Sequence, residues 1–207
     1  MPRQKQRTTE MRARVLSAAV EALTADGVAG LTARRVAHDA QTSTPAVYEL
    51  FGDKGGLIRA IFFEGFRMLR RHLEQTVQAG DELTALRQTI AALRTFMRDS
   101  PELARVMFER PFADFDPGPE DIEAGASVRE FIIDRVRRSV DTGIIAGDPT
   151  DIAHVLTGLA LGLATQEAAG WLGTSQASVD RRWSLGAEIL LNGLSHADPR
   201  PPSAPAY

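Results

Sequence analysis

The 207-residue sequence contains no cysteine, which excludes disulfide bonds and thiolate metal sites and fits a reducing cytoplasm. It also lacks a long apolar run, because the longest one, near Leu159 to Ala164, is short and interrupted by glycine. Residues 1–14 have no apolar signal core, and no stretch shows the alternation of a β-strand. We therefore predict an all-α cytoplasmic protein with no membrane partner.

Catalytic groups are a second absence. The four histidines are scattered along the chain, at His38, His72, His154 and His196. There is no phosphate-binding loop, and no spacing of histidines and carboxylates suits a metal ion. We therefore predict no catalytic residue, no metal site and no cofactor. A small helical enzyme acting in an apolar cavity is kept as an alternative.

The net charge of the whole chain is only −3, but the charge is unevenly distributed. Residues 1–54 carry eight Lys/Arg against six acids, whereas the remainder carries 16 against 21. A basic head on an acidic body is typical of a DNA-binding segment attached to a domain that does not bind DNA. Chance asymmetry in a helical protein is the alternative explanation.

The stretch from Leu31 to Leu57 combines two short helical patterns across a polar turn. Thr32 is a good N-cap for the first helix, and Ser43 or Thr44 can cap the second, which ends near Phe51. The polar residues between the two patterns interrupt the apolar period. These features predict a helix-turn-helix, the motif whose second helix enters the major groove of DNA.

The side chains of this motif suit contacts with DNA. Arg34 can make a bidentate hydrogen bond to guanine, although a solvated helix face is its alternative role, and Thr44 and Ala46 can touch a thymine methyl group. The second helix carries no Lys or Arg. Its attraction to phosphates must therefore come from its N-terminal amides, from Tyr48 and from Lys54.

The rest of the chain follows the helical period, and about nine helices are expected in all. Besides the two above, we predict helices over residues 9–25, 54–78, 81–99, 101–108, 120–142, 148–172 and 178–194. Residues 1–8 and the tail 197–207 are predicted to be disordered. Residues 109–119 contain three prolines and predict a loop, with Phe112 and Phe115 turned inward.

Large apolar side chains beyond residue 54 predict a ligand cavity on the order of a few hundred Å³, although such residues more often form plain core. The polar residues His154, Gln166 and Glu167 suit either that cavity or a dimer partner, and a surface position is the alternative for each. The candidate ligand-binding residues are Phe62, Phe66, Phe96, Met97, Met107, Phe108, Phe112, His154, Gln166 and Trp171. Gly158 and Gly162 would permit close approach of another helix, or a kink.

The order of these pieces resembles the TetR family of bacterial transcriptional regulators. The similar segments, within roughly residues 11–58, are RARVLSAAVEAL, LTARRVA, STPAVYELF and DKGGL. The resemblance implies that the first three helices bind operator DNA and that the later helices form a ligand pocket. It also implies that the last two helices build a four-helix dimer interface.

Carried over by position, the resemblance implies phosphate contacts for Thr32, Tyr48 and Lys54 and a base contact for Arg34. The full set of predicted DNA-binding residues is Thr32, Arg34, Ser43, Thr44, Pro45, Ala46, Tyr48 and Lys54. Two residues depart from the family pattern, in which a turn glycine stands at the position of Gln41 and a histidine at that of Leu50.

The resemblance leads us to expect a homodimeric repressor of bacterial cytoplasm, released from a palindromic operator by a small apolar or amphipathic effector. Residues 1–54 would bind DNA, residues 55–196 would bind the ligand and dimerise, and residues 197–207 would be a tail. A more distant likeness links LTGLALGLATQEAAGWL to one C-terminal subtype, with Thr157 and Leu161 in place of its Trp and His. An interaction module with degenerate DNA binding, suggested by Gln41 and Leu50, is the main alternative.

Overall fold

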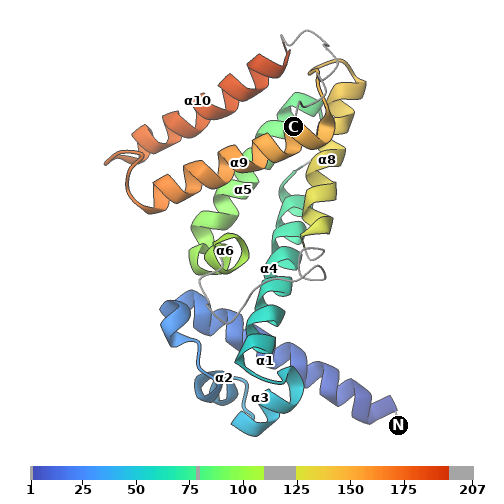
Figure 1. The fold of residues 1–207 in the computed structure, drawn as a ribbon, viewed down its shortest axis with the longest axis vertical. Helices are drawn as coiled ribbons and strands as arrows, with labels where there is room; N and C mark the ends of the chain where they lie inside the picture. The colour runs from blue at the N-terminus through green and yellow to red at the C-terminus, as the bar shows by residue number, and fades with distance from the viewer. Residues whose placement is uncertain (1, 78–79, 110–124, 196–207) are drawn as a thin grey trace, which may run out of the picture. The chain divides into compact units, whose positions relative to one another are not determined.

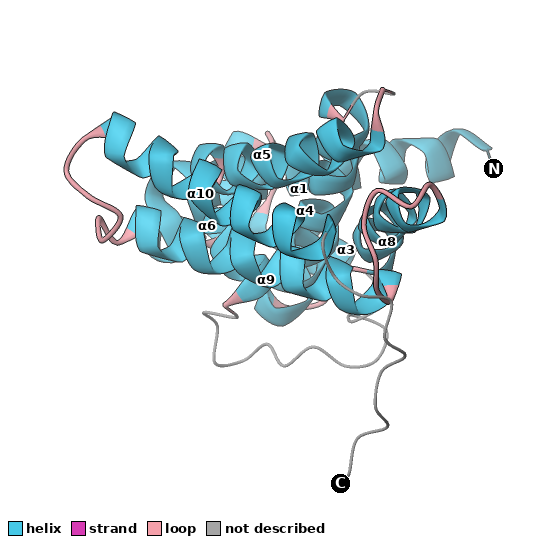
Figure 2. Ribbon diagram, turned by 90° about the horizontal axis from the view of Figure 1, so that it is seen from above, coloured by secondary structure: helices cyan, strands magenta, loops and turns pink. Residues whose placement is uncertain are grey.

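The computed structural model describes residues 2–77, 80–109 and 125–195, and every regular element in these ranges is a helix (Figure 1, Figure 2). The helices are α1 (Pro2–Gly30), α2 (Ala33–Asp39), α3 (Thr44–Phe51), α4 (Lys54–Thr76), α5 (Glu82–Asp99), α6 (Pro101–Phe108), α8 (Ala126–Asp141), α9 (Pro149–Ala168) and α10 (Gln176–Ser195). The prediction of an all-α fold is confirmed. None of the helices in the described ranges has the length and apolar character needed to span a bilayer.

The chain divides into two compact units. The first contains residues 1–69 and 99–126, and therefore α1, α2, α3, most of α4 and α6. The second contains residues 70–98 and 127–207, and therefore the end of α4, all of α9 and α10, and all but one residue each of α5 and α8. This division describes packing, and the predicted functional boundary at residue 54 stays a prediction.

In the first unit, α1 buries Val15, Ala19 and Leu23 at helical spacing and packs against both α2 and α6. The prediction that residues 1–8 are disordered is wrong from residue 2 onward, because α1 begins at Pro2. The sequence PRQKQR explains this early start, since proline is favoured at the first helical position and Arg, Gln and Lys are good helix formers.

The predicted end of the first helix near Ala25 agrees with a break in α1, because the backbone at Gly27 is not helical (φ 64°, ψ −164°). A further helical stretch follows this kink and carries α1 to Gly30. A Cβ atom on Gly27 would lie 3.3 Å from Glu102 Oε2 of α6. Glycine is therefore suited to this position both by its positive φ and by the close approach of α6.

In the second unit, α9 and α10 lie side by side as a helical hairpin (Figure 1). Asp148 caps α9, since its Oδ1 accepts hydrogen bonds from Thr150 N at 2.8 Å and Asp151 N at 3.0 Å. The helix ends at Ala168, four residues before the predicted end, and a turn with Gly170 at φ 74° follows. Helix α10 runs slightly beyond the predicted range at both ends.

Several predictions concern residues outside the described ranges. These are most of the loop at 109–119 with Phe112 and Phe115, the predicted helix start at residue 120, and the tail at 197–207. Within the described chain, α8 begins at Ala126.

Candidate nucleic-acid interface

Two capped helices form the predicted helix-turn-helix. Arg35 N donates to Thr32 Oγ1 at 3.3 Å at the start of α2, and Ala46 N donates to Ser43 Oγ at 3.3 Å at the start of α3. Of the two cap candidates for α3, Ser43 is therefore the cap, and Pro45 lies in the first turn. The N-terminal motif expected from the sequence is present.

The turn between α2 and α3 adopts a left-handed conformation at Gln41. Gln41 N donates to His38 O at 3.0 Å, and Thr42 N donates to Ala37 O at 2.8 Å. Gln41 has φ 52°, the only positive φ at a non-glycine residue in the described chain. Such a conformation costs an L-residue with a side chain roughly 1–2 kcal/mol. The turn geometry that suits glycine thus forms without one.

Helix α3 buries Val47 and Phe51 and leaves its other side accessible. Tyr48 is 43% exposed, whereas Leu50 is half-buried. The remaining DNA-binding candidates are exposed at Thr32, Arg34, Ser43, Pro45 and Lys54 and half-buried at Thr44 and Ala46. The predicted contact residues are thus all accessible at least in part.

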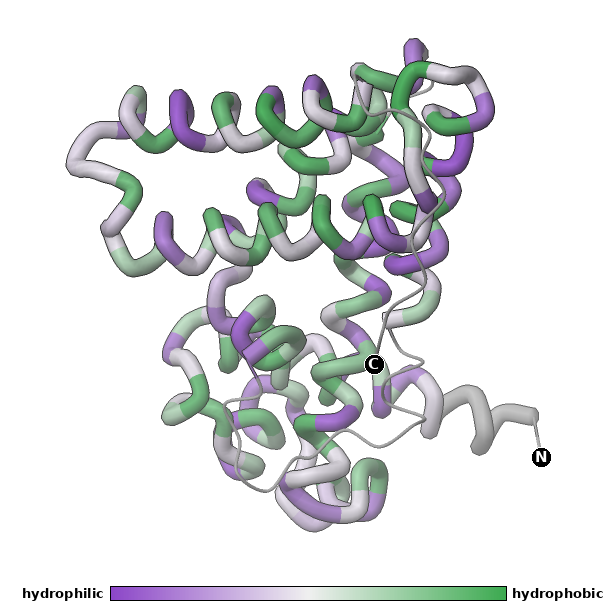
Figure 3. Tube along the Cα trace, turned by 45° about the horizontal axis from the view of Figure 1, so that its top comes forward, coloured by the Kyte–Doolittle hydropathy of each residue, from purple (hydrophilic) through white to green (hydrophobic). Residues whose placement is uncertain are grey.

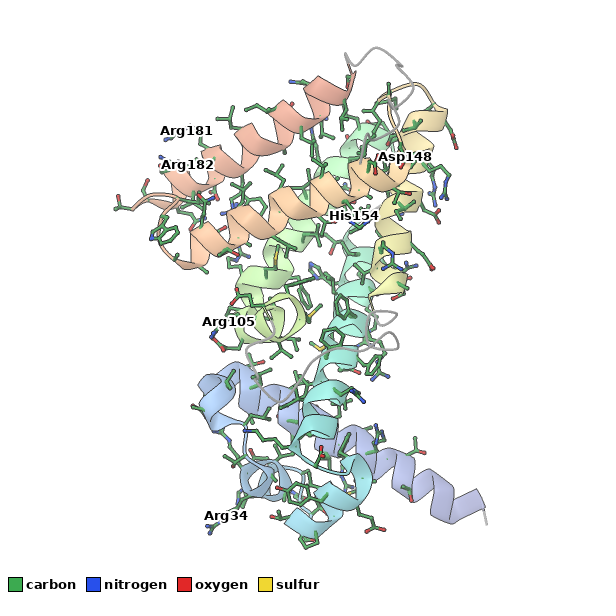
Figure 4. The ribbon with its side chains drawn as sticks, in the orientation of Figure 1. Arg34, Arg105, Asp148, His154, Arg181 and Arg182 are labelled. Carbon is green, nitrogen blue, oxygen red and sulfur yellow. The ribbon has the colours of Figure 1, made fainter. Side chains whose placement is uncertain are left out.

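The two neighbouring arginines of α2 have different surroundings. Arg35 forms ion pairs with Asp26 and with Asp39, the latter at 3.4 Å. The hydrogen bond between His38 and Asp39, followed by that from Arg35, holds the pKa of Asp39 below its usual value. Arg34 is exposed, extends outward from α2 (Figure 4), and has no carboxylate partner among the described residues. Only Arg34 is therefore available for a base.

The family resemblance singled out Arg34 for a base contact, but the sequence did not predict the ion pairs that occupy Arg35. The i,i+4 spacing of Arg35 and Asp39 is a usable signal for an ion pair on one helix. The pairing of Arg35 with Asp26 could not be read locally, because it joins α2 to α1.

The predicted ligand residues of the first unit pack against one another. The ring centroids of Phe62 and Phe66 are 5.0 Å apart, and those of Phe66 and Phe108 are 5.8 Å apart. A Cβ atom on Gly65 would lie 2.6 Å from Met107 Sδ, so α4 and α6 approach closely there. Four of the ten candidates are thus neighbours in one apolar cluster.

The other candidates are dispersed over the second unit. Phe96 and Met97 are buried on α5, whereas His154 (Figure 4) and Gln166 are exposed on α9. Trp171 is 78% exposed in the turn after α9. Phe112 lies outside the described residues.

A polar network that the sequence did not predict joins α5, α9 and α10. Arg94 Nε and Nη2 donate to the two carboxylate oxygens of Glu167, each at 2.9 Å, and Arg94 Nη2 lies 2.8 Å from Asp180. Trp183 Nε1 donates to Glu167 Oε2 at 2.6 Å. The bonds from Arg94 are the main reason that the pKa of Glu167 lies below its usual value, against the opposing effect of burial.

A hollow of about 230 Å³ lies beside this network, between α5 and α10. Its lining residues are Arg87, Ile90, Ala91, Arg94, Asp180, Trp183, Ser184, Ala187 and Glu188. Arg94 and Glu167 are 73 residues apart in the sequence, so no local spacing could predict the polar network.

Helices α9 and α10 expose apolar side chains. Val155, Leu185 and Ile189 are large hydrophobic residues exposed to solvent, and hydrophobic residues recur along both helices (Figure 3). A Cβ atom on Gly158 or Gly162 would meet no atom within 4 Å, so the α9 surface is open at both glycines. A partner surface that covers these residues would remove apolar area from water.

Comparisons with known proteins agree with this arrangement. A family model described as "Bacterial regulatory proteins, tetR family" matches residues 15–61, and one described as "Tetracyclin repressor-like, C-terminal domain" matches residues 86–190. Comparison with curated proteins finds no match.

Among the described residues, no three His, Asp or Glu side chains are grouped so as to hold a metal ion.

Solved structures with a similar fold cover nearly the whole chain. A protein of unknown function from Rhodococcus sp. RHA1 is 28% identical, with a TM-score of 0.77 over 90% of this chain and 96% of that one. A regulatory protein of the tetR family from Rhodococcus RHA1 is 21% identical, with a TM-score of 0.65 over 91% and 98%. A TetR variant from Acinetobacter baumannii AYE, solved with minocycline, is 17% identical, with a TM-score of 0.57 over 86% and 93%.

Proposed function

The chain belongs to the TetR family of bacterial transcriptional regulators, and from this premise we propose that it is a homodimeric repressor that leaves its operator when a small effector binds. Its membership makes it a DNA-binding transcriptional regulator. The observation that carries the finer proposal is the combination of a capped recognition helix, α3, with the exposed Arg34 beside it.

In this proposal, the start of α3 enters the major groove. Thr44 and Ala46 approach thymine methyl groups, and Arg34 donates two hydrogen bonds to a guanine. Phosphates are held by Thr32, Ser43, Tyr48 and Lys54 and by the N-terminal amides of α3. Pro45 has no backbone N–H to offer a phosphate and lies with Thr44 and Ala46 at the base-facing start of the helix. The small number of cations predicts moderate, salt-sensitive affinity.

Dimerisation through α9 and α10 is the second part of the proposal. The exposed side chains of Val155, Leu185 and Ile189 support it, because each would be buried against a second copy of the hairpin. The two recognition helices of such a dimer would lie about 34 to 36 Å apart, in successive major grooves of a near-palindromic site.

The effector is proposed to be small and apolar or amphipathic, because the ligand candidates are mostly aromatic and Met side chains. The minocycline complex of the A. baumannii relative supports an effector of this size. We assign DNA binding to residues 1–54 and effector binding and dimerisation to residues 55–196, in a cytoplasmic protein. The effector would act by binding one conformation more tightly than the other.

The first experiment is selection of DNA from a random or genomic pool by the purified protein at near-physiological salt. Enrichment of a palindrome is expected, and addition of candidate effectors should then release the selected DNA. A pool without enrichment would overturn the repressor proposal in favour of an interaction module with degenerate DNA binding. An enriched palindrome at which the protein activates transcription in a reporter assay would overturn the repressor role alone.

A further inference from the structure

Arg12 reaches from α1 to the C-terminal end of α3. Its Nη1 donates to Leu50 O at 2.6 Å, and its guanidinium carbon lies 4.3 Å from the centroid of the Phe51 ring. Leu50 and Phe51 are the last two residues of the recognition helix. One side chain from another helix therefore holds both the backbone and a buried side chain where α3 ends.

The end of α3 needs such a partner. The last turn has no basic residue of its own, although the final carbonyl groups of a helix lack intrahelical donors and carry partial negative charge. Gly52 N donates to Tyr48 O at 2.7 Å, and a Cβ atom on Gly56 would lie only 1.9 Å from Phe51 O. The carbonyl group of Leu50 accepts its hydrogen bond from Arg12. The same side chain places a positive charge at the C-terminal end of α3.

The same guanidinium is stacked on an aromatic ring that is 8% exposed, which fixes its position from a second direction. These contacts occupy the Arg12 guanidinium, as the ion pairs with Asp26 and Asp39 occupy that of Arg35, so Arg12 is turned toward the protein and not left open like Arg34. We propose that Arg12 is a positioning residue of the recognition helix: it sets the orientation of α3, and thereby of Tyr48, without touching DNA. This inference rests on the proposed function, in that α3 reads the operator.

Replacement of Arg12 by methionine is a suitable perturbation. An open groove beside the side chain is lined by Arg12, Leu16, Ala60, Phe63 and Arg67, so a methionine can follow the path of the arginine stem without burying a charge. Arg14→Met is the matched control, since it removes the same charge from the same helix, and within the described part of the chain the Arg14 guanidinium bonds to Met11 Sδ alone, at 3.2 Å. Arg12→Lys keeps a donor and a cation but loses the planar stacking.

The first measurement needs no DNA. Hydrogen exchange of the α3 amides, followed by mass spectrometry on the full-length protein, should be about tenfold faster in Arg12→Met, as expected from loss of one charge-assisted hydrogen bond at a helix end. Arg14→Met should match the wild type, and Arg12→Lys should lie between. Equal exchange in Arg12→Met and Arg14→Met would overturn the positioning role, whether or not an operator is found.

The second measurement uses the selected palindrome, with fluorescence anisotropy over a range of salt concentrations. Arg12→Met should weaken operator binding about tenfold while leaving the slope of log K against log salt unchanged, because no phosphate contact is lost. A slope reduced by about 0.9 would instead identify Arg12 as a phosphate ligand and refute the proposal. So would operator affinity within about twofold of the wild type despite faster exchange in α3. If the wild type selects no DNA, the repressor proposal fails, while the exchange data still decide whether Arg12 holds α3.

Discussion

The ion-pair network of the second unit gives a stability prediction whose size follows from exposure. The side chains of Arg94 and Glu167 are only 15% and 17% exposed, and two hydrogen bonds of 2.9 Å join them. Removing one partner of a buried pair costs roughly 3–5 kcal/mol, because the other charge is left unpaired. Since some solvent reaches this pair and Arg94 keeps Asp180 as a second carboxylate partner at 2.8 Å, we expect a smaller effect: Glu167→Gln should lower the free energy of unfolding by about 2–3 kcal/mol.

The neighbouring pair of Arg87 and Glu188 is a matched control. It has the same bidentate geometry, with distances of 2.9 and 3.2 Å, but its side chains are 40% and 44% exposed. Exposed pairs contribute at most about 1 kcal/mol, so Glu188→Gln should have a small effect. The Arg94–Glu167 pair joins α5 to α9, and the Arg87–Glu188 pair joins α5 to α10. Both pairs therefore connect α5 to the same helical hairpin, and the two variants can be compared directly.

Urea unfolding at a fixed protein concentration, followed by circular dichroism, measures both variants with unchanged m-values expected. A double-mutant cycle with Arg94→Met should give a coupling energy of at least about 1 kcal/mol between Arg94 and Glu167. The reasoning is refuted if Glu167→Gln and Glu188→Gln have equal stability within error, or if the cycle is additive.

Further predictions concern DNA binding, assembly and pH. Tyr48→Phe should weaken operator binding roughly tenfold, because one hydrogen bond to a charged phosphate is lost. Lys54→Ala should reduce the slope of log K against log salt by about 0.9. Fluorescence anisotropy measures both, and an unchanged affinity and slope would argue against these contacts. Arg34→Met should relax the base preference at one operator position, at a cost of about 1–3 kcal/mol, and an unchanged selected motif would exclude base reading. If α9 and α10 form the proposed dimer interface, Ile189→Glu should shift the protein toward monomer in sedimentation, because the dimer would bury an unpaired charge. A variant that sediments like the wild-type dimer would exclude this interface. Since the folded-state pKa of Glu167 is lowered, the stability difference between wild type and Glu167→Gln should be full at neutral pH and shrink as the pH falls through that pKa; a constant difference down to about pH 3 would contradict this.

The local parts of the fold could be predicted because their signals are local. The caps at Thr32, Ser43 and Asp148 act within three residues of their own positions, and each caps the helix that the sequence predicted. The start of α1 depends on two local signals that disagree. The polarity of residues 1–8 is typical of a disordered end, whereas the helix propensity of PRQKQR favours the helix that begins at Pro2.

The long-range parts could not be predicted from local patterns. Arg12 and Leu50 are 38 residues apart, and Arg94 and Glu167 are 73 apart, so only the fold brings each pair together. In both cases the sequence shows only how many charged residues are present, whereas the structure shows which residue each of them contacts. The same holds for Arg34 and Arg35, which are adjacent residues of the same type. Their surroundings differ because Asp26 of α1 forms an ion pair with Arg35 and not with Arg34.

Apolar periodicity identifies a hydrophobic helix face but not what covers it. Leu156 and Val155 are neighbours on α9, and both fit the pattern of an apolar helix, yet Leu156 is fully buried and Val155 is exposed. On α10, Leu191 is buried while Leu185 and Ile189 are exposed. The exposed residues Val155, Leu185 and Ile189 are therefore not part of the core of a single chain. Its apolar area stays in contact with water unless another surface covers it, and this is the physical reason to place the dimer interface on α9 and α10.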